Sequence, residues 1–254
     1  MKVQQIIVKK PAASFAQGLT TANLGTPDYS KVLEQHRAYV EVMEEAGVMV
    51  HQLASDNDYP DDVFVEDPAV VTSKFALITR PGADSRRGET EAVEAALKDY
   101  HRRMYTISEP GTLEGGDVLH VEDHFYIGLS TRTNKSGAEQ FEAILQKEGY
   151  GATIIPLKEF FHLKTGIAYL GDNTVLTAGE FIDHDVFKKY KQITVSQEEE
   201  YAANCIRVNE VVIVPEGFPE TKRKIEEAGF MTREAAVSEF RKQDGGLSCL
   251  SLRF

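Results

Sequence analysis

Five polar residues recur at a similar spacing along the chain: Asp67, Glu114, His162, Asn204 and Cys249. Neighbouring members lie 42 to 48 residues apart, so each falls near the same phase of a repeat of that length. Two carboxylates, an imidazole and a thiol brought together could hold a cation, attack an electrophilic carbon and move protons. The shared phase therefore predicts one pocket with cysteine-based nucleophilic chemistry.

Each of these residues, taken alone, also has a structural explanation. Cys249 stands among leucines and fits a small buried apolar residue. His162 fits a surface or hydrogen-bonded core histidine, Asp67 precedes a proline as turn residues do, and Glu114 precedes two glycines as a loop acid would. Only their common position in the repeat favours chemistry.

The elements that would position these residues also repeat. Apolar periodicity predicts units of two strands, a helix and a further strand. The expected segments are strands 63–71 and 75–79, helix 87–100 and strand 103–107; strands 113–120 and 125–129, helix 137–147 and strand 153–156; strands 167–170 and 174–178 with a less regular segment 181–190; strands 206–208 and 211–214 with helix 219–228; and strands 247–252, 4–9 and 49–53 with helix 29–45.

The last unit takes one strand from the end of the sequence and the rest from its start. Such stitching implies a closed ring, because closure removes the open ends that a linear repeat must cap. We predict a single α/β domain over residues 1–254, built from five pseudo-symmetric units whose first strands face one axis. The alternative is an irregular α+β domain without true repeats.

The amino-acid composition and net charge limit the classes of partner that this protein can bind. The 254 residues suffice for one or two domains, and 42% hydrophobic with 27% charged residues excludes a disordered or fibrous chain. A net charge of −12 disfavours nucleic acid and anionic membranes as partners and permits a cationic small molecule. Two cysteines, no signal-like start and no long apolar run predict a cytoplasmic protein.

Six ordered motifs carry a family resemblance: Phe64-Val65-Glu66-Asp67-Pro68, Ile78 to Ala83 with Ser85-Arg86-Arg87, Gly111 to Asp117, Thr131 to Asn134, His162-Leu163-Lys164 and Ser248-Cys249. The chain resembles the dimethylarginine dimethylaminohydrolase family of guanidino-group-modifying enzymes over its whole length. The resemblance implies the five-bladed α/β-propeller, or pentein, fold.

The resemblance also implies a reaction. Asp67 and Glu114 would bind the substrate guanidinium through charge-assisted hydrogen bonds. Cys249 would attack its central carbon and form a covalent thiouronium intermediate, while His162 would protonate the leaving dimethylamine and later accept a proton from water. Citrulline would be the second product, and neither a metal nor a cofactor would be needed.

Further substrate contacts follow from the resemblance. Arg86 and Arg132 match residues that contact the substrate α-carboxylate, whereas Asp61 and the Leu19 carbonyl match positions near the α-amine. Glu66, Phe64 and Ser248 lie within the matching motifs and are also expected to bind substrate. Leu19 belongs to a segment over residues 14–26 that could close over the site, with Gly18 and Gly25 as hinges.

The electrostatics of such a site raise a difficulty for the nucleophile. Nearby carboxylates raise the pKa of a thiol and so disfavour the thiolate. A cation bound between the acids reverses this effect. We therefore expect activation of Cys249 to depend on ligand binding as well as on His162.

The position two residues after His162 narrows the reaction. Related arginine deiminases and amidinotransferases typically carry an acid there, which pairs with an unsubstituted guanidinium nitrogen, but this chain has Lys164. The missing acid favours a methylated nitrogen, which donates fewer hydrogen bonds. Phe161 and Gln243 depart from the residues usual in relatives, so preference between mono- and dimethylarginine, and activity on arginine, stay open.

The alternatives are other enzymes of the same superfamily, a non-catalytic binding protein and a metal-dependent hydrolase. An arginine deiminase or amidinotransferase would release ammonia or transfer an amidino group. A non-catalytic binding protein of the same fold is expected to lack Cys249 and His162. The sequence has no H-E-x-x-H spacing typical of a metal-dependent hydrolase. It allows a homodimer.

Overall fold

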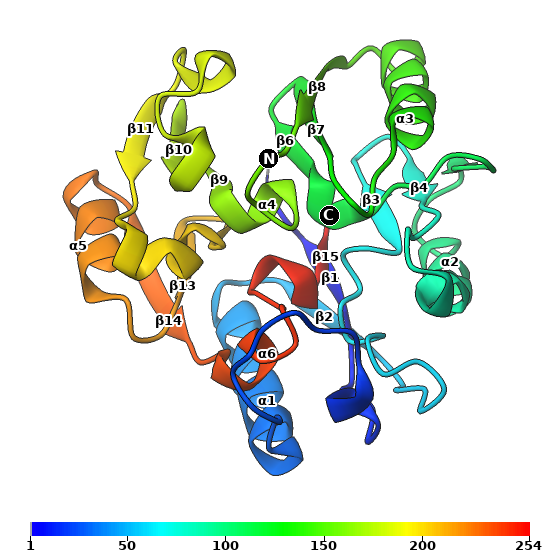
Figure 1. Cartoon of the computed structure of the whole chain (residues 1–254), viewed down its shortest axis with the longest axis horizontal. Coiled ribbons are helices and arrows are strands. Elements are labelled where there is room, and N and C mark those ends of the chain that lie inside the picture. Colours follow the sequence, from blue (N-terminus) through cyan, green and yellow to red (C-terminus); the bar gives the residue numbers. More distant parts are fainter. Residues whose placement is uncertain (1) are drawn as a thin grey trace.

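The computed structural model describes residues 2–254 and contains five separate three-stranded sheets. Figure 1 shows them arranged around a common centre, with the longer helices on the outside. In chain order the sheets are β3 (Ala69–Val71), β4 (Ala76–Ile78), β5 (Met104–Thr106); β6 (Val118–Val121), β7 (His124–Leu129), β8 (Gly151–Pro156); β9 (Ile167–Gly171), β10 (Thr174–Thr177), β11 (Lys191–Thr194); β12 (Ile206–Val208), β13 (Val211–Pro215), β14 (Met231–Ala235); and β15 (Leu252–Arg253), β1 (Gln5–Lys9), β2 (Met49–Leu53).

All five sheets share one topology. The first strand runs antiparallel to the middle strand, and the third runs parallel to it. A parallel neighbour requires a crossover connection, which explains the helical segment before each third strand. In the fifth sheet β1 pairs with β15, so segments from the two ends of the described chain lie side by side.

Helices supply these crossovers in four of the units. They are α1 (Tyr29–Glu45), α2 (Thr90–Leu97), α3 (Lys135–Lys147) and α5 (Pro219–Glu227), and the short α4 (Leu163–Gly166) and α6 (Ser238–Arg241) lie nearer the centre (Figure 1). In the third unit two 3-10 turns, η4 (Gly179–Phe181) and η5 (Asp185–Phe187), take the place of a helix. The predicted irregularity of 181–190 is confirmed.

Side-chain capping and apolar faces explain where the long helices begin and what they cover. Asp28 accepts a hydrogen bond from the Ser30 amide at the start of α1, and Asn134 accepts one from the Gly137 amide at the start of α3. Each helix buries one apolar stripe, such as Phe141 and Leu145 of α3, against its sheet.

The strand predicted over 247–252 was largely wrong. Ser248–Leu250 form the 3-10 turn η7, and the strand begins only at Leu252. The apolar residues Leu247 and Leu250 are fully buried without strand pairing, so hydrophobicity alone misled the assignment. Likewise the helix expected over 87–100 is α-helical only from Thr90 to Leu97, because Asp84–Glu89 form the 3-10 helix η2.

Among the described residues no helix is both long and apolar enough to traverse a lipid bilayer.

Candidate active site

The polar residues that share a phase of the repeat all precede the first strand of a sheet. Asp67 lies in the turn before β3, Glu114 opens the turn η3 (Gly115–Asp117) before β6, and His162 caps α4 before β9. Asn204 precedes β12, and Cys249 lies in η7 before β15. The side chains of Asp67, Glu114 and His162 place ligand atoms within 4.8 Å of one another, and Asp67, His162 and Cys249 line one cavity.

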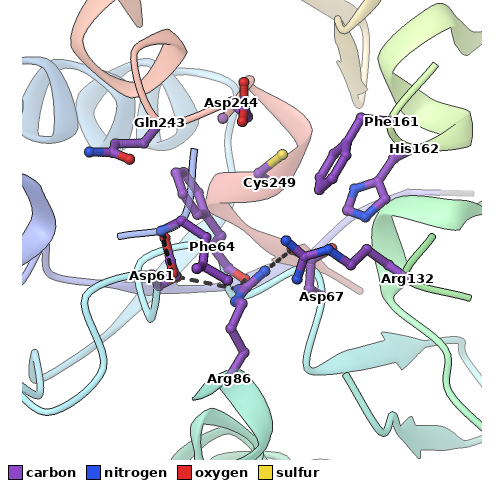
Figure 2. A pocket seen from close by; sticks show the side chains of 12 residues that line it. Asp61, Phe64, Asp67, Arg86, Arg132, Phe161, His162, Gln243, Asp244 and Cys249 are labelled. Atoms are coloured by element: carbon purple, nitrogen blue, oxygen red, sulfur yellow. Dashed lines mark hydrogen bonds and ion pairs between the residues drawn. The ribbon is translucent and has the colours of Figure 1, made fainter. Parts of the chain in front are cut away.

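A small cavity opens among these turns, as Figure 2 shows. Its free volume is about 30 Å³, far below the several hundred Å³ of an open ligand pocket. Cys249 and His162 lie in the upper part of the view with the Phe161 ring between them, while Arg86 enters from below and Arg132 from the right. The lining residues are Leu19, Asp61, Phe64, Asp67, Arg86, Arg132, Phe161, His162, Gln243, Asp244, Gly245 and Cys249.

His162 is paired with Glu114 behind the cavity. The Nε2 atom lies 3.0 Å from Glu114 Oε2, and both residues are almost fully buried. Burial of the imidazole opposes its protonation, but the carboxylates of Asp117, Glu114 and Asp67 prevail and raise the pKa of His162 to about 9. At neutral pH the ring is therefore an imidazolium, ready to act as an acid.

Glu114 does not line the cavity. Burial opposes its charge, yet the hydrogen bond from His162 and the nearby cations lower its pKa to about 2. Its Oε1 accepts a hydrogen bond from the Gly82 amide and lies 3.6 Å from Nη1 of Arg132. In this structure Glu114 contacts His162 and Arg132, and its direct contact with a substrate guanidinium stays a prediction.

Cys249 has the raised pKa that the carboxylates predict, with a second cause added. Burial is the larger effect, and the charges of Glu66 and Asp67 add to it, so that the pKa of the thiol rises to about 12. Without a bound cation the nucleophile is therefore held as a thiol.

Asp67 faces the cavity while bound to protein donors. Its Oδ2 accepts a hydrogen bond from Nη1 of Arg86 at 2.7 Å, and its Oδ1 accepts one from the Gly116 amide at 3.0 Å. A carboxylate offers about four acceptor positions, so two remain for a ligand.

Arg86 is fixed by several acceptors. It donates to Glu89 through Nε and Nη2, to Asp67, and to the main-chain carbonyls of Asp61 and Phe64. Burial opposes its charge, but the two carboxylates raise its pKa well above the ordinary value. Arg86 is thus a permanent, rigidly held cation at the cavity wall.

Arg132 is held less fully. Its guanidinium lies 5.1 Å from the ring centre of Phe161, a cation–π contact. Its Nη1 atom is buried and has no hydrogen-bond partner among the described residues. A buried donor without a partner is costly, so this atom is suited to an acceptor on a ligand.

The segment 14–26 borders the cavity through Leu19. The Leu19 amide donates to both carboxylate oxygens of Asp61, at 3.1 and 3.0 Å, and burial is the main cause of the raised pKa of Asp61. Farther along, the Thr21 amide donates to Asp244 Oδ2 at 2.5 Å. These bonds close the segment over the site.

The two glycines of this segment differ. Gly25 has a φ of +85° and open space around it, which suits a hinge. Gly18 has an ordinary φ of −62°, and a Cβ there would lie 2.3 Å from Asp61 Oδ1. Gly18 therefore permits close approach to Asp61, whereas the hinge role was expected for both.

Glu66 and Ser248, both expected to bind substrate, do not line the cavity. Glu66 Oε1 accepts from Lys164 at 2.5 Å and from Arg253 at 2.9 Å, and its Oε2 accepts from Ser248 Oγ at 2.7 Å. Asn204 in turn binds Ser248 through Nδ2 and Oδ1. These groups form a polar network behind the nucleophile, because Glu66 and its neighbour Asp67 point to opposite sides of their turn.

Asp67, Glu114 and His162 also place three potential metal-ligating atoms within 4.8 Å of one another. All three residues already have partners within the protein. Asp67 accepts a hydrogen bond from Arg86, Glu114 accepts one from the Gly82 amide, and His162 is paired with Glu114. A protonated imidazole cannot coordinate a metal. The cluster is better suited to organic cations.

Sequence reasoning assigned no role to two residues of this region. Asp244 lines the cavity and anchors the covering segment. Asp117 is completely buried beside His162. It stands inside the motif from Gly111 to Asp117, and an acid following two glycines was the only available signal.

Comparisons with known proteins agree with this geometry. A sequence profile described as N,N dimethylarginine dimethylhydrolase, eukaryotic, matches residues 25–243. A protein of Pseudomonas aeruginosa named N(G),N(G)-dimethylarginine dimethylaminohydrolase is 50% identical over 252 residues, which are 99% of each chain. A protein of the same name from Streptomyces coelicolor is 34% identical, covering 100% of this chain and 98% of its own.

Solved structures also resemble this chain, to different degrees. A cysteine-to-serine variant of the Pseudomonas aeruginosa enzyme, complexed with citrulline, superposes with a TM-score of 0.99 at 49% identity, with both chains fully covered. The N-terminal domain of the cyanobacterial arginine dihydrolase ArgZ superposes with a TM-score of 0.89 at 20% identity, covering 99% of this chain and 98% of its own. At that identity the likeness concerns the fold alone.

Proposed function

Because the chain belongs to the dimethylarginine dimethylaminohydrolase family, we propose that it hydrolyses N(omega),N(omega)-dimethylarginine and N-monomethylarginine to citrulline, releasing dimethylamine or methylamine. The observation that supports this proposal is that three reactive groups line a single cavity. They are the thiol of Cys249, the protonated imidazole of His162 and the buried carboxylate of Asp67.

The guanidinium end of the substrate lies against Asp67 and Cys249. The cation shares the free acceptor positions of Asp67. Its positive charge beside the sulfur lowers the pKa of the Cys249 thiol, which then loses its proton to solvent. The nucleophile is in this way formed only when its target is in place.

Bond making and breaking then follow in two stages. The thiolate attacks the central guanidinium carbon, and His162 transfers its proton to the dimethylamino nitrogen as the carbon–nitrogen bond breaks. Dimethylamine leaves, and a thiouronium cation remains on Cys249. Water then attacks the same carbon, giving a proton to the now neutral His162. The carbon–sulfur bond breaks, the hydroxyl proton passes to the sulfur, and citrulline is released.

The amino-acid end lies against the two arginines and the covering segment. Nη1 of Arg132, which is buried and has no hydrogen-bond partner within residues 2–254, and the fixed cation of Arg86 suit the α-carboxylate. Asp61 and the Leu19 carbonyl suit the α-ammonium group. Because the free volume is only about 30 Å³, the segment must open before substrate enters.

Lys164 favours a methylated substrate over free arginine. It is turned away from the cavity into its ion pair with Glu66, so no second acid stands beside His162 on that side. An unsubstituted nitrogen would leave its donors unpaired there, whereas a methylated one has fewer to satisfy.

We further infer that the five sheets close into a propeller that forms one domain. Contacts of β9 with both β6 and β12, and of β15 with β3, support this closure.

Two unpaired cysteines support a reducing, cytoplasmic location. Light scattering would distinguish a monomer from a homodimer.

The test is incubation with asymmetric dimethylarginine, followed by assays for citrulline and dimethylamine. We expect both products from the wild type and from Cys205→Ser, a matched control at the other, buried cysteine, and none from Cys249→Ser. Citrulline and ammonia from arginine at a higher kcat/KM would instead identify an arginine deiminase. Equal product from wild type and Cys249→Ser would refute the assignment.

A further inference from the structure

Asp117 is a buried acid that the proposed reaction does not use. It ends η3, three residues after Glu114, and has no exposed surface. It does not line the cavity and therefore cannot touch the substrate. A charged carboxylate in such a place is costly unless it serves a partner.

The hydrogen-bond partners of Asp117 are all neutral. Its Oδ1 accepts from the Leu163 amide at 3.1 Å, and its Oδ2 accepts from Ser130 Oγ and Thr133 Oγ1, each at 2.6 Å. Three donors satisfy the oxygens without neutralising a charge on them. Burial raises the pKa of Asp117, so its ionised form depends on a cation nearby.

That cation is His162. Leu163 is the next residue, so the bond to its amide fixes the main chain at the imidazole, where α4 packs on η3. The other charged or titratable groups around the ring are Glu114 and Asp67, the thiol of Cys249, and Arg132 and Arg86. Burial opposes protonation of His162, and Asp117 provides the largest contribution that raises its pKa.

We propose that Asp117 is a positioning residue whose buried carboxylate holds His162 as an imidazolium during protonation of the leaving amine. This role is needed because the other two carboxylates near His162 also interact with other cations. Asp67 is shared with Arg86 and the substrate cation, and Glu114 is shared with Arg132. Asp117 is separated from the substrate, so its charge stays available to the imidazole throughout the reaction.

The substitution Asp117→Asn removes the negative charge of the side chain and keeps its shape. The amide oxygen can still accept from the Leu163 amide, and the amide nitrogen can donate to both hydroxyl oxygens after these rotate. Thr133→Val is the matched control, because it removes one donor to Asp117, together with the acceptor of the Glu114 amide, and leaves the Asp117 carboxylate in place.

The kinetic experiment rests on the proposed function and measures citrulline formation from dimethylarginine against pH. For Asp117→Asn we expect the apparent pKa of His162 in the profile of kcat/KM to fall by about one pH unit, as removal of one nearby charge typically does. This corresponds to about a fivefold loss of kcat/KM relative to the wild type at pH 9 and little change at pH 7. In Thr133→Val this apparent pKa should stay in place even if kcat falls.

A second measurement does not depend on turnover. Nuclear magnetic resonance of the histidine side chains of the whole protein, with the His162 signal assigned from a His162→Gln variant, gives the titration directly. We expect a midpoint well above 6.5 in the wild type and a lower one in Asp117→Asn. A wild-type midpoint at or below 6.5 overturns the proposal, even where Asp117→Asn does not fold or no citrulline forms. Coincident midpoints in the two proteins, or an equal shift in Thr133→Val, also overturn it.

Discussion

Ligand-dependent ionisation of Cys249 is the sharpest consequence of the site. In the empty cavity, burial and the carboxylates of Glu66 and Asp67 raise the pKa of the thiol to about 12. A cation bound beside the sulfur stabilises the Cys249 thiolate and so lowers the pKa of the thiol. The perturbation to apply is therefore a small cation that resembles the guanidinium end of the substrate, methylguanidinium.

The size of the effect can be calculated. A unit charge about 4 Å from the sulfur, at an effective dielectric constant of about 20, stabilises the thiolate by about 4 kcal/mol. This equals about three pKa units, so the midpoint should fall from about 12 to about 9. At pH 8 the thiolate fraction then rises about a thousandfold, from about one molecule in ten thousand to about one in ten.

The assay is the ultraviolet absorbance of the thiolate, titrated against pH with and without saturating methylguanidinium. Cys205 is also buried, with a pKa raised to about 12, so the spectrum of Cys249→Ser is subtracted to remove its contribution. Methylurea, which has a similar shape and no charge, is the matched ligand control and should leave the midpoint unchanged.

Two results would refute this reasoning. A thiolate signal from the ligand-free enzyme near neutral pH would show that the empty site already stabilises the anion. Equal midpoints with methylguanidinium and methylurea would show that filling the cavity, and not its charge, determines the ionisation.

Three further outcomes follow from the same contacts. Gly116→Ala would place a Cβ 2.4 Å from Nδ1 of His162, so we expect kcat to fall more than about a hundredfold while circular dichroism is unchanged; near-normal kcat would contradict this. Asp244→Ala removes the acceptor of the Thr21 amide, so KM should rise about three- to tenfold with kcat nearly constant, and an unchanged KM would argue against the anchor. The lowered pKa of Glu114 stabilises the folded state above pH 4.5, and this contribution is lost as pH falls toward about 2. The free energy of unfolding in urea should therefore depend less on pH in Glu114→Gln than in the wild type over this range. An identical pH dependence in the two proteins would count against this role of Glu114.

Periodicity predicted the sheets well because it reflects burial. Strands such as β1, with Ile6 and Ile7 fully buried, and β13 carry apolar runs that only a covered sheet accommodates. The stitched fifth unit was predicted for the same reason, since 4–9 and 49–53 match the observed β1 and β2 to within a residue.

The segments around the site were harder to predict. Cys249 lies in a 3-10 turn, where the apolar residues around it pack without strand pairing. Glu66 and Asp67 are neighbours, yet one joins the network behind the nucleophile and the other lines the cavity. An irregular turn has no fixed period, so the direction of each side chain depends on partners that lie far away in sequence, here Lys164 and Arg86.

The pairing of β1 with β15 makes the surroundings of the nucleophile depend on a contact between residues far apart in the chain. One edge of β1 is covered only when Leu252 and Arg253 pair with it, and the turn that carries Cys249 leads into that strand. Truncation before Leu252 would therefore uncover this edge of β1, and truncation before Cys249 would also remove the nucleophile.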